Sequence, residues 1–164
     1  MREGWAACVV ALGTNMGDRE DIAFQALADI RAVEGFAVTQ ASSLHETVAL
    51  TSEGFDPSAP SYVNQVVLLD SAWSPEKTLE KLLEIEQAHG RVRTDQRYAD
   101  RTLDLDLITH GDNVYESEFL TLPHPRAHER SFVLGPWQEV DPAATIPGLG
   151  SVQGLLLALT QDRS

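Results

Sequence analysis

The chain has 164 residues, of which 43% are hydrophobic and 23% are charged, and its formal net charge is −13. This length and composition are those of an ordinary globular protein and predict a single domain over residues 1–164. The acidic balance disfavours a nucleic-acid backbone as partner, and no apolar run approaches the roughly 20 residues that span a bilayer.

The first predicted element is a strand over residues 5–12. It contains the only cysteine, Cys8, which we expect to be a buried thiol in a reducing compartment. The strand ends in the turn Gly13–Gly17, and apolar residues then recur at helical spacing from about Asp18 until Gly35. The turn lacks the Gly-Lys-Ser/Thr ending of a P-loop, so we interpret it as a tight turn. The lone cysteine and the lack of a membrane-length apolar run favour a cytoplasmic protein, with no nucleic acid and no membrane among its partners. We also expect small-molecule partners and a monomer.

Two further strands are predicted over residues 36–46 and 62–71, both rich in β-formers. The segment between them, Thr47–Ser61, contains Gly54, Asp56-Pro57 and Pro60. Such punctuation predicts a long loop of the kind that is usually retained for function.

The strongest helix signal begins at Ser74-Pro75, with Ser as N-cap and Pro in the first turn, and we expect Gly90 to end the helix. Its predicted apolar stripe consists of Leu79, Leu82 and Leu83. Glu86 lies on the same side of this helix. Two interpretations remain open: a carboxylate at the stripe edge with its head in water, or a carboxylate turned toward the loop that follows.

The second half of the chain also contains both strands and helices. The predicted elements are a strand Leu103–Thr109, a turn His110–Asn113, a short strand Val114–Tyr115, a break at Leu122–Pro125, and helices Ala127–Glu139 and Ser151–Thr160. Strands joined both by helices and by hairpin-like turns favour an α+β sandwich, with helices packed on a largely antiparallel sheet.

Positive charge is concentrated in one part of this acidic chain. Six of the 12 Lys and Arg residues are arginines between Arg91 and Arg130, and four of them lie in the run Arg91–Arg101. The planar guanidinium group donates paired hydrogen bonds and keeps its charge, which suits phosphate. Asp95 and Asp100 interrupt the run, so a solvated loop is the alternative.

Directly after the arginines, Asp104 and Asp106 alternate with Leu103, Leu105 and Leu107. Residues two apart on a strand share a face, so the carboxylates project together while the leucines enter the core. Paired carboxylates are suited to Mg²⁺, which takes few ligands from protein and the rest from water and phosphate. Any half-exposed strand can alternate in this way, but the adjacent arginines favour a site for a metal-bound polyphosphate. His124 lies between two prolines and is a candidate phosphate donor or a packing residue.

These motifs resemble those of the 6-hydroxymethyl-7,8-dihydropterin pyrophosphokinase family. The resemblance is carried by 90–108, which contains Arg-Thr-Leu-Asp-Leu-Asp, and by the blocks 11–17, 62–66, 122–124 and 130–136. It covers nearly the whole chain in order. It implies a ferredoxin-like α+β fold and transfer of pyrophosphate from Mg-ATP to the hydroxymethyl group of the pterin, releasing AMP, in folate biosynthesis.

The resemblance also implies residue roles. Catalysis is assigned to Arg91, Arg93, Arg101, Asp104 and Asp106, and the two aspartates bind two magnesium ions. The ATP-binding set is Glu86, Arg93, Tyr98, Arg101, Leu107, Ile108, Thr121, His124 and Arg130. The pterin-binding set is Thr47, Leu50, Tyr62, Asn64 and Phe132. The Thr47–Ser61 and Arg91–Asp100 loops are expected to close over the ligands and exclude water.

Three departures from the family pattern are visible. The first loop reads Thr47-Val48-Ala49-Leu50-Thr51, where Thr-Pro-Pro-x-Gly is usual. The aromatic residue of the second loop, often Trp in the family, is Tyr98. Pro125-Arg126 follows His124, where some members have Tyr. The first departure keeps open a paralogue that acts on another pterin-like alcohol. A non-catalytic nucleotide-binding module and a metal-dependent phosphohydrolase also stay open as functions, and the intact Asp104 and Asp106 disfavour the non-catalytic module.

Overall fold

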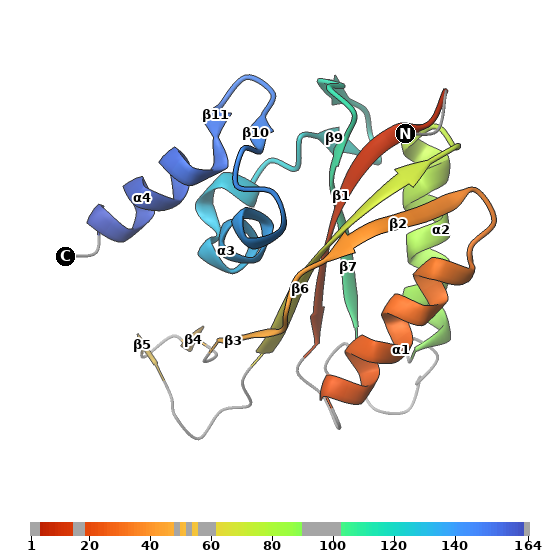
Figure 1. The fold of residues 1–164 in the computed structure, drawn as a ribbon, viewed down its shortest axis with the longest axis horizontal. Helices are drawn as coiled ribbons and strands as arrows, with labels where there is room; N and C mark the ends of the chain where they lie inside the picture. The colour runs from red at the N-terminus through yellow and green to blue at the C-terminus, as the bar shows by residue number, and fades with distance from the viewer. Residues whose placement is uncertain are drawn as a thin grey trace.

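A computed structural model of the chain describes residues 4–14, 19–47, 50–51, 54–55, 62–89 and 103–162. At its centre is one antiparallel sheet (Figure 1). Its strands, in spatial order, are β2 (Phe36–Ala41), β6 (Tyr62–Ser71), β1 (Ala6–Thr14) and β7 (Asp104–His110), and β3 (His45–Thr47) also pairs with β6. The predicted α+β architecture with a largely antiparallel, ferredoxin-like sheet is confirmed.

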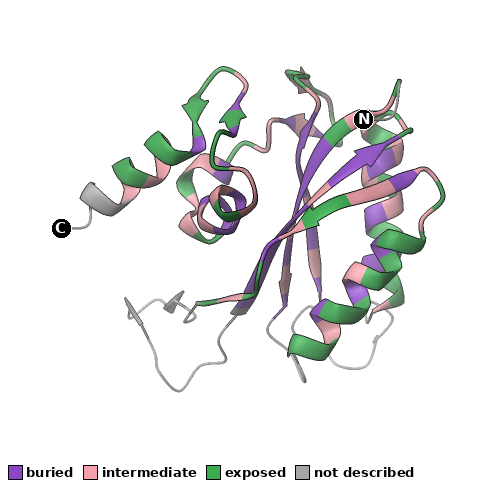
Figure 2. Ribbon diagram, viewed as in Figure 1, coloured by how far each residue is buried: buried purple, intermediate pink, exposed green. Residues whose placement is uncertain are grey.

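Helices cover both faces of the sheet (Figure 1). One face carries α1 (Arg19–Ala32) and α2 (Pro75–Ala88), and the other carries α3 (Ser131–Val140) and α4 (Val152–Asp162). Each layer has its own apolar core, with Leu82 in the first and Trp137 in the second. Figure 2 shows that buried residues are concentrated in the sheet and on the helix sides that face it. None of the helices that the structure describes is both long and apolar enough to cross a membrane.

The remaining elements are short. They are β4 (Leu50–Thr51), β5 (Gly54–Phe55), β8 (Tyr115–Glu116), β9 (Thr121–Leu122), η1 (Ala127–Glu129), β10 (Thr145–Ile146) and β11 (Gly150–Ser151). The predicted short strand near Tyr115 is β8, and its partner β9 was not predicted. Two-residue strands carry no period that a sequence pattern can reveal.

The prediction of one continuous strand over 36–46 was wrong. The chain leaves the sheet after β2 and returns to the same partner strand as β3. At the break, the Ser42 N–H still donates to the Val66 carbonyl at 2.9 Å, but the Val66 N–H donates to the Ser42 hydroxyl at 3.0 Å and not to a backbone carbonyl. A serine hydroxyl competes with backbone groups in this way, which a β-propensity pattern does not register.

The helix predicted from Ser74-Pro75 is confirmed as α2, with the Ser74 side chain accepting from the Lys77 N–H. Its predicted stripe was wrong in one member, because Leu83 is 41% exposed. The buried positions are Thr78, Leu82, Ile85 and Glu86. Their spacing of four, three and one follows one helix face, and Leu83 lies about 100° away from Leu82.

The helix predicted over Ala127–Glu139 is two elements. The 3₁₀ turn η1 ends and α3 begins on either side of Arg130, whose backbone is extended, with φ −116° and ψ 102°. This break places Arg130 at the N-cap of α3. The last predicted helix is confirmed as α4, which starts at Val152 after the β10–β11 hairpin.

Cys8 is buried within the first core, as expected, with 2% of its surface exposed. Burial, and secondarily the charge of Asp70, raises the pKa of the thiol to about 12. A thiol that stays protonated is a poor nucleophile and metal ligand, so Cys8 serves as a packing residue.

A carboxylate on α3 fastens the segment that enters the Thr47–Ser61 loop. Glu139 accepts hydrogen bonds of 2.8 Å from both the N–H and the hydroxyl of Ser43, and it lies 2.7 Å from Nε2 of His45. The His45 contact is the largest cause, and the two Ser43 bonds the next, of a pKa for Glu139 lowered to about 2. Because both Ser43 and His45 engage the carboxylate, the group is suited to clamping the backbone before β3.

We expect this clamp to make stability pH-dependent in the acid range. The folded-state pKa of Glu139 lies below its ordinary value of 4.5. The contribution of this carboxylate to the free energy of unfolding is therefore complete above about pH 4.5 and is lost as the pH falls toward 2. The side chain is 40% exposed, so solvent screening limits the effect to less than about 1 kcal/mol. Urea unfolding between pH 5 and pH 3 should therefore show a smaller loss of unfolding free energy for Glu139→Gln than for the parent protein. The exposed helical Glu84→Gln serves as the control, and parallel pH curves for all three proteins would contradict the clamp.

Candidate active site

Strand register brings the two halves of the predicted site onto one face of the sheet. Asn64 on β6 and Asp104 on β7 both pair with Gly13 on the central strand β1. Directly paired residues of antiparallel strands project to the same side. The next row on that side pairs Val66 and Asp106 with Ala11, and Val66 packs in the core under α3. The predicted pterin residue and the predicted metal carboxylates therefore share the α3 side of the sheet.

Gly13 makes room in the middle of this row. A Cβ atom at that position would lie 3.3 Å from Oδ1 of Asn64, which is tighter than ordinary van der Waals contact. The Asn64 side chain is 7% exposed. The absence of a side chain at Gly13 thus allows the buried amide to lie across the central strand.

The alternation predicted for β7 is confirmed. Leu103, Leu105 and Leu107 are at most 2% exposed, whereas Asp104 and Asp106 are half-buried. Two half-buried carboxylates on one strand face fit Mg²⁺, which keeps most of its water and phosphate ligands. Within the described residues, no group of three or more His, Cys, Asp or Glu side chains is placed to hold a metal ion. Asp104 and Asp106 offer only oxygen atoms as donors, which is the ligand type that Mg²⁺ takes.

Glu86 lies under this strand. Its carboxylate is 4% exposed and Oε2 accepts a hydrogen bond of 2.6 Å from the Leu105 N–H. The interpretation of Glu86 as a stripe-edge carboxylate with its head in water was wrong, because α2 packs this position against β7. The bond holds the backbone between Asp104 and Asp106, so Glu86 fixes the strand that carries both carboxylates.

Arg130 connects Asp106 with the N-terminus of α3. Its Nη1 lies 3.8 Å from Oδ2 of Asp106, and its guanidinium carbon lies 5.8 Å from the centre of the Phe132 ring. The Arg130 and Asp106 side chains are 30% and 44% exposed, so both remain accessible to a ligand. Phe132 is 39% exposed in the first turn of α3.

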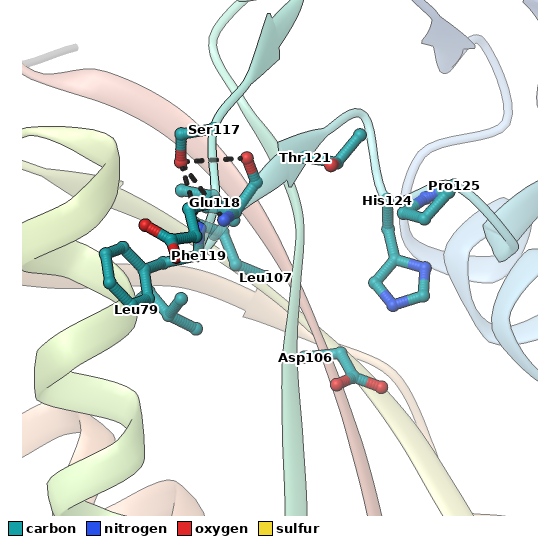
Figure 3. A pocket seen from close by; sticks show the side chains of 10 residues that line it. Leu79, Asp106, Leu107, Ser117, Glu118, Phe119, Thr121, His124 and Pro125 are labelled. Carbon is teal, nitrogen blue, oxygen red and sulfur yellow. Dashed lines mark hydrogen bonds between the residues drawn. The ribbon is translucent and has the colours of Figure 1, made fainter.

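His124 approaches the same carboxylate from the segment after β9 (Figure 3). Its backbone N–H donates to the Ile108 carbonyl at 2.8 Å, which fixes its position beside β7. Burial lowers the pKa of His124, and the charge of Asp106 opposes this shift. The Arg126 N–H donates to Nδ1 at 3.2 Å. The proton of the neutral ring is therefore on Nε2, where it is available to a phosphate oxygen.

A cavity of about 300 Å³ opens beside Asp106 (Figure 3). The lining residues are Leu79, Asp106, Leu107, Ser117, Glu118, Phe119, Leu120, Thr121, His124 and Pro125. Three of them, Leu107, Thr121 and His124, belong to the predicted ATP-binding set. The Ile108 side chain is fully buried in the second core, and Ile108 is not among the lining residues.

The rest of the predicted site is placed only in part. Arg91, Arg93, Tyr98 and Arg101 lie outside the described residues, as do the whole Arg91–Asp100 loop and part of the Thr47–Ser61 loop. Thr47, Leu50 and Tyr62 are described as backbone in β3, β4 and β6. Sequence reasoning missed Ser117, Glu118 and Phe119, which line the cavity, and it gave Leu79 only a core role. The one signal for them was an aromatic residue in the polar segment before Leu-Thr-Leu-Pro-His.

Comparison with known sequences gives a consistent match. Residues 9–142 match the profile of a family described as 7,8-dihydro-6-hydroxymethylpterin-pyrophosphokinase (HPPK). A Synechocystis sp. protein is 41% identical over 142 residues, covering 87% of this chain and 70% of the relative. A Bacillus subtilis protein is 37% identical over 131 residues, covering 80% of this chain and 75% of the relative. Both relatives are named 2-amino-4-hydroxy-6-hydroxymethyldihydropteridine pyrophosphokinase.

Solved structures show the same fold at lower identity. The crystal structure of Plasmodium falciparum HPPK-DHPS with pterin and p-hydroxybenzoate superposes with a TM-score of 0.72 at 13% identity. The match covers 96% of this chain and 44% of that one, so this chain spans less than half of the Plasmodium protein. A second Plasmodium HPPK-DHPS structure, the A437G/K540E variant, gives a TM-score of 0.73 at 13% identity and likewise covers 96% of this chain and 44% of that one.

Proposed function

The chain belongs to the 7,8-dihydro-6-hydroxymethylpterin-pyrophosphokinase family, and from this membership we propose how its own residues perform the reaction. The enzyme transfers a pyrophosphoryl group from ATP to the hydroxymethyl group of 6-hydroxymethyl-7,8-dihydropterin in folate biosynthesis, and AMP is released. The observation that carries the residue assignment is the strand register. It sets Asn64 and Asp104 on either side of Gly13, on the same face of the sheet.

At the phosphate end, Asp104 and Asp106 would hold magnesium, and we propose two ions. Bound magnesium would supply charge neutralisation at the phosphate oxygens and a template that aligns them. Arg130 and the Nε2–H of His124 then contact phosphate oxygens from the α3 side. Glu86 acts through the Leu105 N–H, at 2.6 Å, by fixing the strand that carries the carboxylates.

At the pterin end, Asn64 hydrogen-bonds the edge of the ring and Phe132 packs on its face. A flat heterocycle with a polar edge requires this combination of an amide and an aromatic group. The guanidinium of Arg130 lies over the Phe132 ring, so the pterin-facing and phosphate-facing residues are in contact. Thr47, Leu50 and Tyr62 are proposed to complete this end.

The reaction joins the two ends. The pterin hydroxyl oxygen forms a bond with the β-phosphorus, while the bond from the β-phosphorus to the oxygen shared with the α-phosphate breaks. AMP leaves with that oxygen, and the hydroxyl proton is released. Little covalent work falls to the protein, so alignment and charge neutralisation supply the rate. Arg91, Arg93, Arg101 and Tyr98 are proposed to cover the phosphates and exclude water.

Product analysis tests the function directly. The protein incubated with Mg-ATP and 6-hydroxymethyl-7,8-dihydropterin should form AMP and the pterin diphosphate in equal amounts. A lack of pterin-dependent AMP would contradict the assignment, and ADP or phosphate would favour a hydrolase. Omitting the pterin is the control.

The proposal includes a monomer in the cytoplasm, which light scattering and cell fractionation can check.

A further inference from the structure

One aromatic side chain is exposed where the fold gives it no structural reason to be. Phe119 is 80% exposed, more than any other large hydrophobic side chain in the described part of the chain. It also lines the cavity beside Asp106. Single exposed apolar side chains are common, and Phe24 and Val114 are also exposed, so Phe119 differs from them in lining a cavity that a ligand could fill.

The turn that carries Phe119 is held in place by hydrogen bonds. The Ser117 hydroxyl accepts from the N–H groups of Phe119 at 3.3 Å and Leu120 at 3.2 Å. The Ser117 N–H donates to the Leu120 carbonyl at 2.8 Å. Leu120 is itself buried in the first core, so the turn is anchored to the body of the protein. The ring therefore stands on a preorganised support, which reduces the entropy lost when a ligand binds.

The cavity has two chemically different ends. Figure 3 shows Phe119 and Leu79 at one end, and Asp106 with His124 at the other. Leu79 comes from α2 and Phe119 from the segment between β8 and β9, so separate elements supply the apolar walls. Such a cavity fits a ligand with a planar apolar part and an anionic, metal-binding part.

We propose that Phe119 stacks on the purine base of the nucleotide and sets the affinity for the base, while Asp106 and His124 face its phosphates. This inference rests on the proposed function, because it takes the anionic end of the cavity as the polyphosphate site. An aromatic ring contributes to base binding through its π-face and does not act on the phosphates. Phe119 therefore contributes affinity for the base of the nucleotide and takes no part in the chemical step.

Calorimetric titration with two probes tests the proposal. One probe is Mg²⁺ with a non-hydrolysable ATP analogue, and the other is Mg²⁺ with inorganic tripolyphosphate, which has no base. We expect Phe119→Ala to weaken binding of the analogue by about 10-fold and to leave binding of tripolyphosphate within about twofold. Phe119→Tyr keeps the ring face and should restore binding of the analogue. Phe24→Ala is the matched control, because Phe24 is 72% exposed on α1 and does not line the cavity.

Two results would overturn the stacking role. One is an unchanged affinity of Phe119→Ala for the analogue, and the other is an equal loss for both probes, which would place the effect at the phosphates. If the parent protein bound neither probe, both this inference and the proposed function would fail. If it bound the analogue with the expected Phe119 dependence but formed no pterin diphosphate, only the function would fail.

Discussion

Replacing Asp106 with alanine is expected to lower turnover at least about 1,000-fold with the fold retained, which corresponds to about 4 kcal/mol of transition-state stabilisation. The carboxylate is half-buried on β7 and the leucines on either side of it are buried, so the strand keeps its packing when the side chain is removed. In the proposed mechanism the substitution weakens magnesium binding, and therefore the neutralisation of the phosphate oxygens. AMP formation at saturating Mg²⁺, with circular dichroism of the same samples, measures both parts of the expectation.

The control is Asp112→Ala, which removes an exposed carboxylate from the turn after β7 and should retain the parent rate. Electron paramagnetic resonance with Mn²⁺ adds a readout that does not depend on turnover. The parent protein and Asp112→Ala should bind the nucleotide-associated ion, and Asp106→Ala should bind it more weakly. Near-normal AMP formation by Asp106→Ala would refute the metal role.

Replacing Arg130 with alanine is expected to lower kcat by about 100-fold, the scale measured when one preorganised donor is removed from developing negative charge. Arg130 lies 3.8 Å from Asp106, with its guanidinium over the Phe132 ring. Among the described residues it is therefore the cation that can reach the phosphates from the pterin side. Arg130→Lys should recover part of the rate, because lysine keeps the charge and loses the planar fork. Single-turnover measurements at saturating substrates separate this effect from binding.

Arg126 provides the comparison for that experiment. It lies four residues before Arg130, is 68% exposed and pairs with Glu129 at 3.8 Å. An exposed pair of this kind contributes little, so Arg126→Ala should leave kcat within about twofold. Equal losses for Arg126→Ala and Arg130→Ala would mean that general positive charge, and no specific contact, supports the reaction.

Local residue patterns in the sequence were enough to predict several elements of the fold and part of the site. Alternation of leucine and aspartate placed Asp104 and Asp106 on one strand face because side chains on a strand have a period of two. The Ser74-Pro75 pair located the start of α2 because both residues satisfy the geometry of a helix N-terminus. The arginine and aspartate spacing resembled one family strongly enough to predict the reaction. Each of these features depends on neighbours within a few positions along the chain.

Tertiary structure decided what depends on neighbours in space. The pairing of Asn64 and Asp104 with Gly13 follows from strand register. Asn64 lies 51 positions after Gly13 in the chain, and Asp104 lies 91 positions after it. The buried bond from the Leu105 N–H to Glu86 arises because α2 packs against β7, so a residue that resembled a surface carboxylate became internal. Phe119 became a candidate ligand contact only when its exposure and the cavity beside it were known. A sequence therefore specifies chemistry at each position, whereas packing decides which of those positions meet.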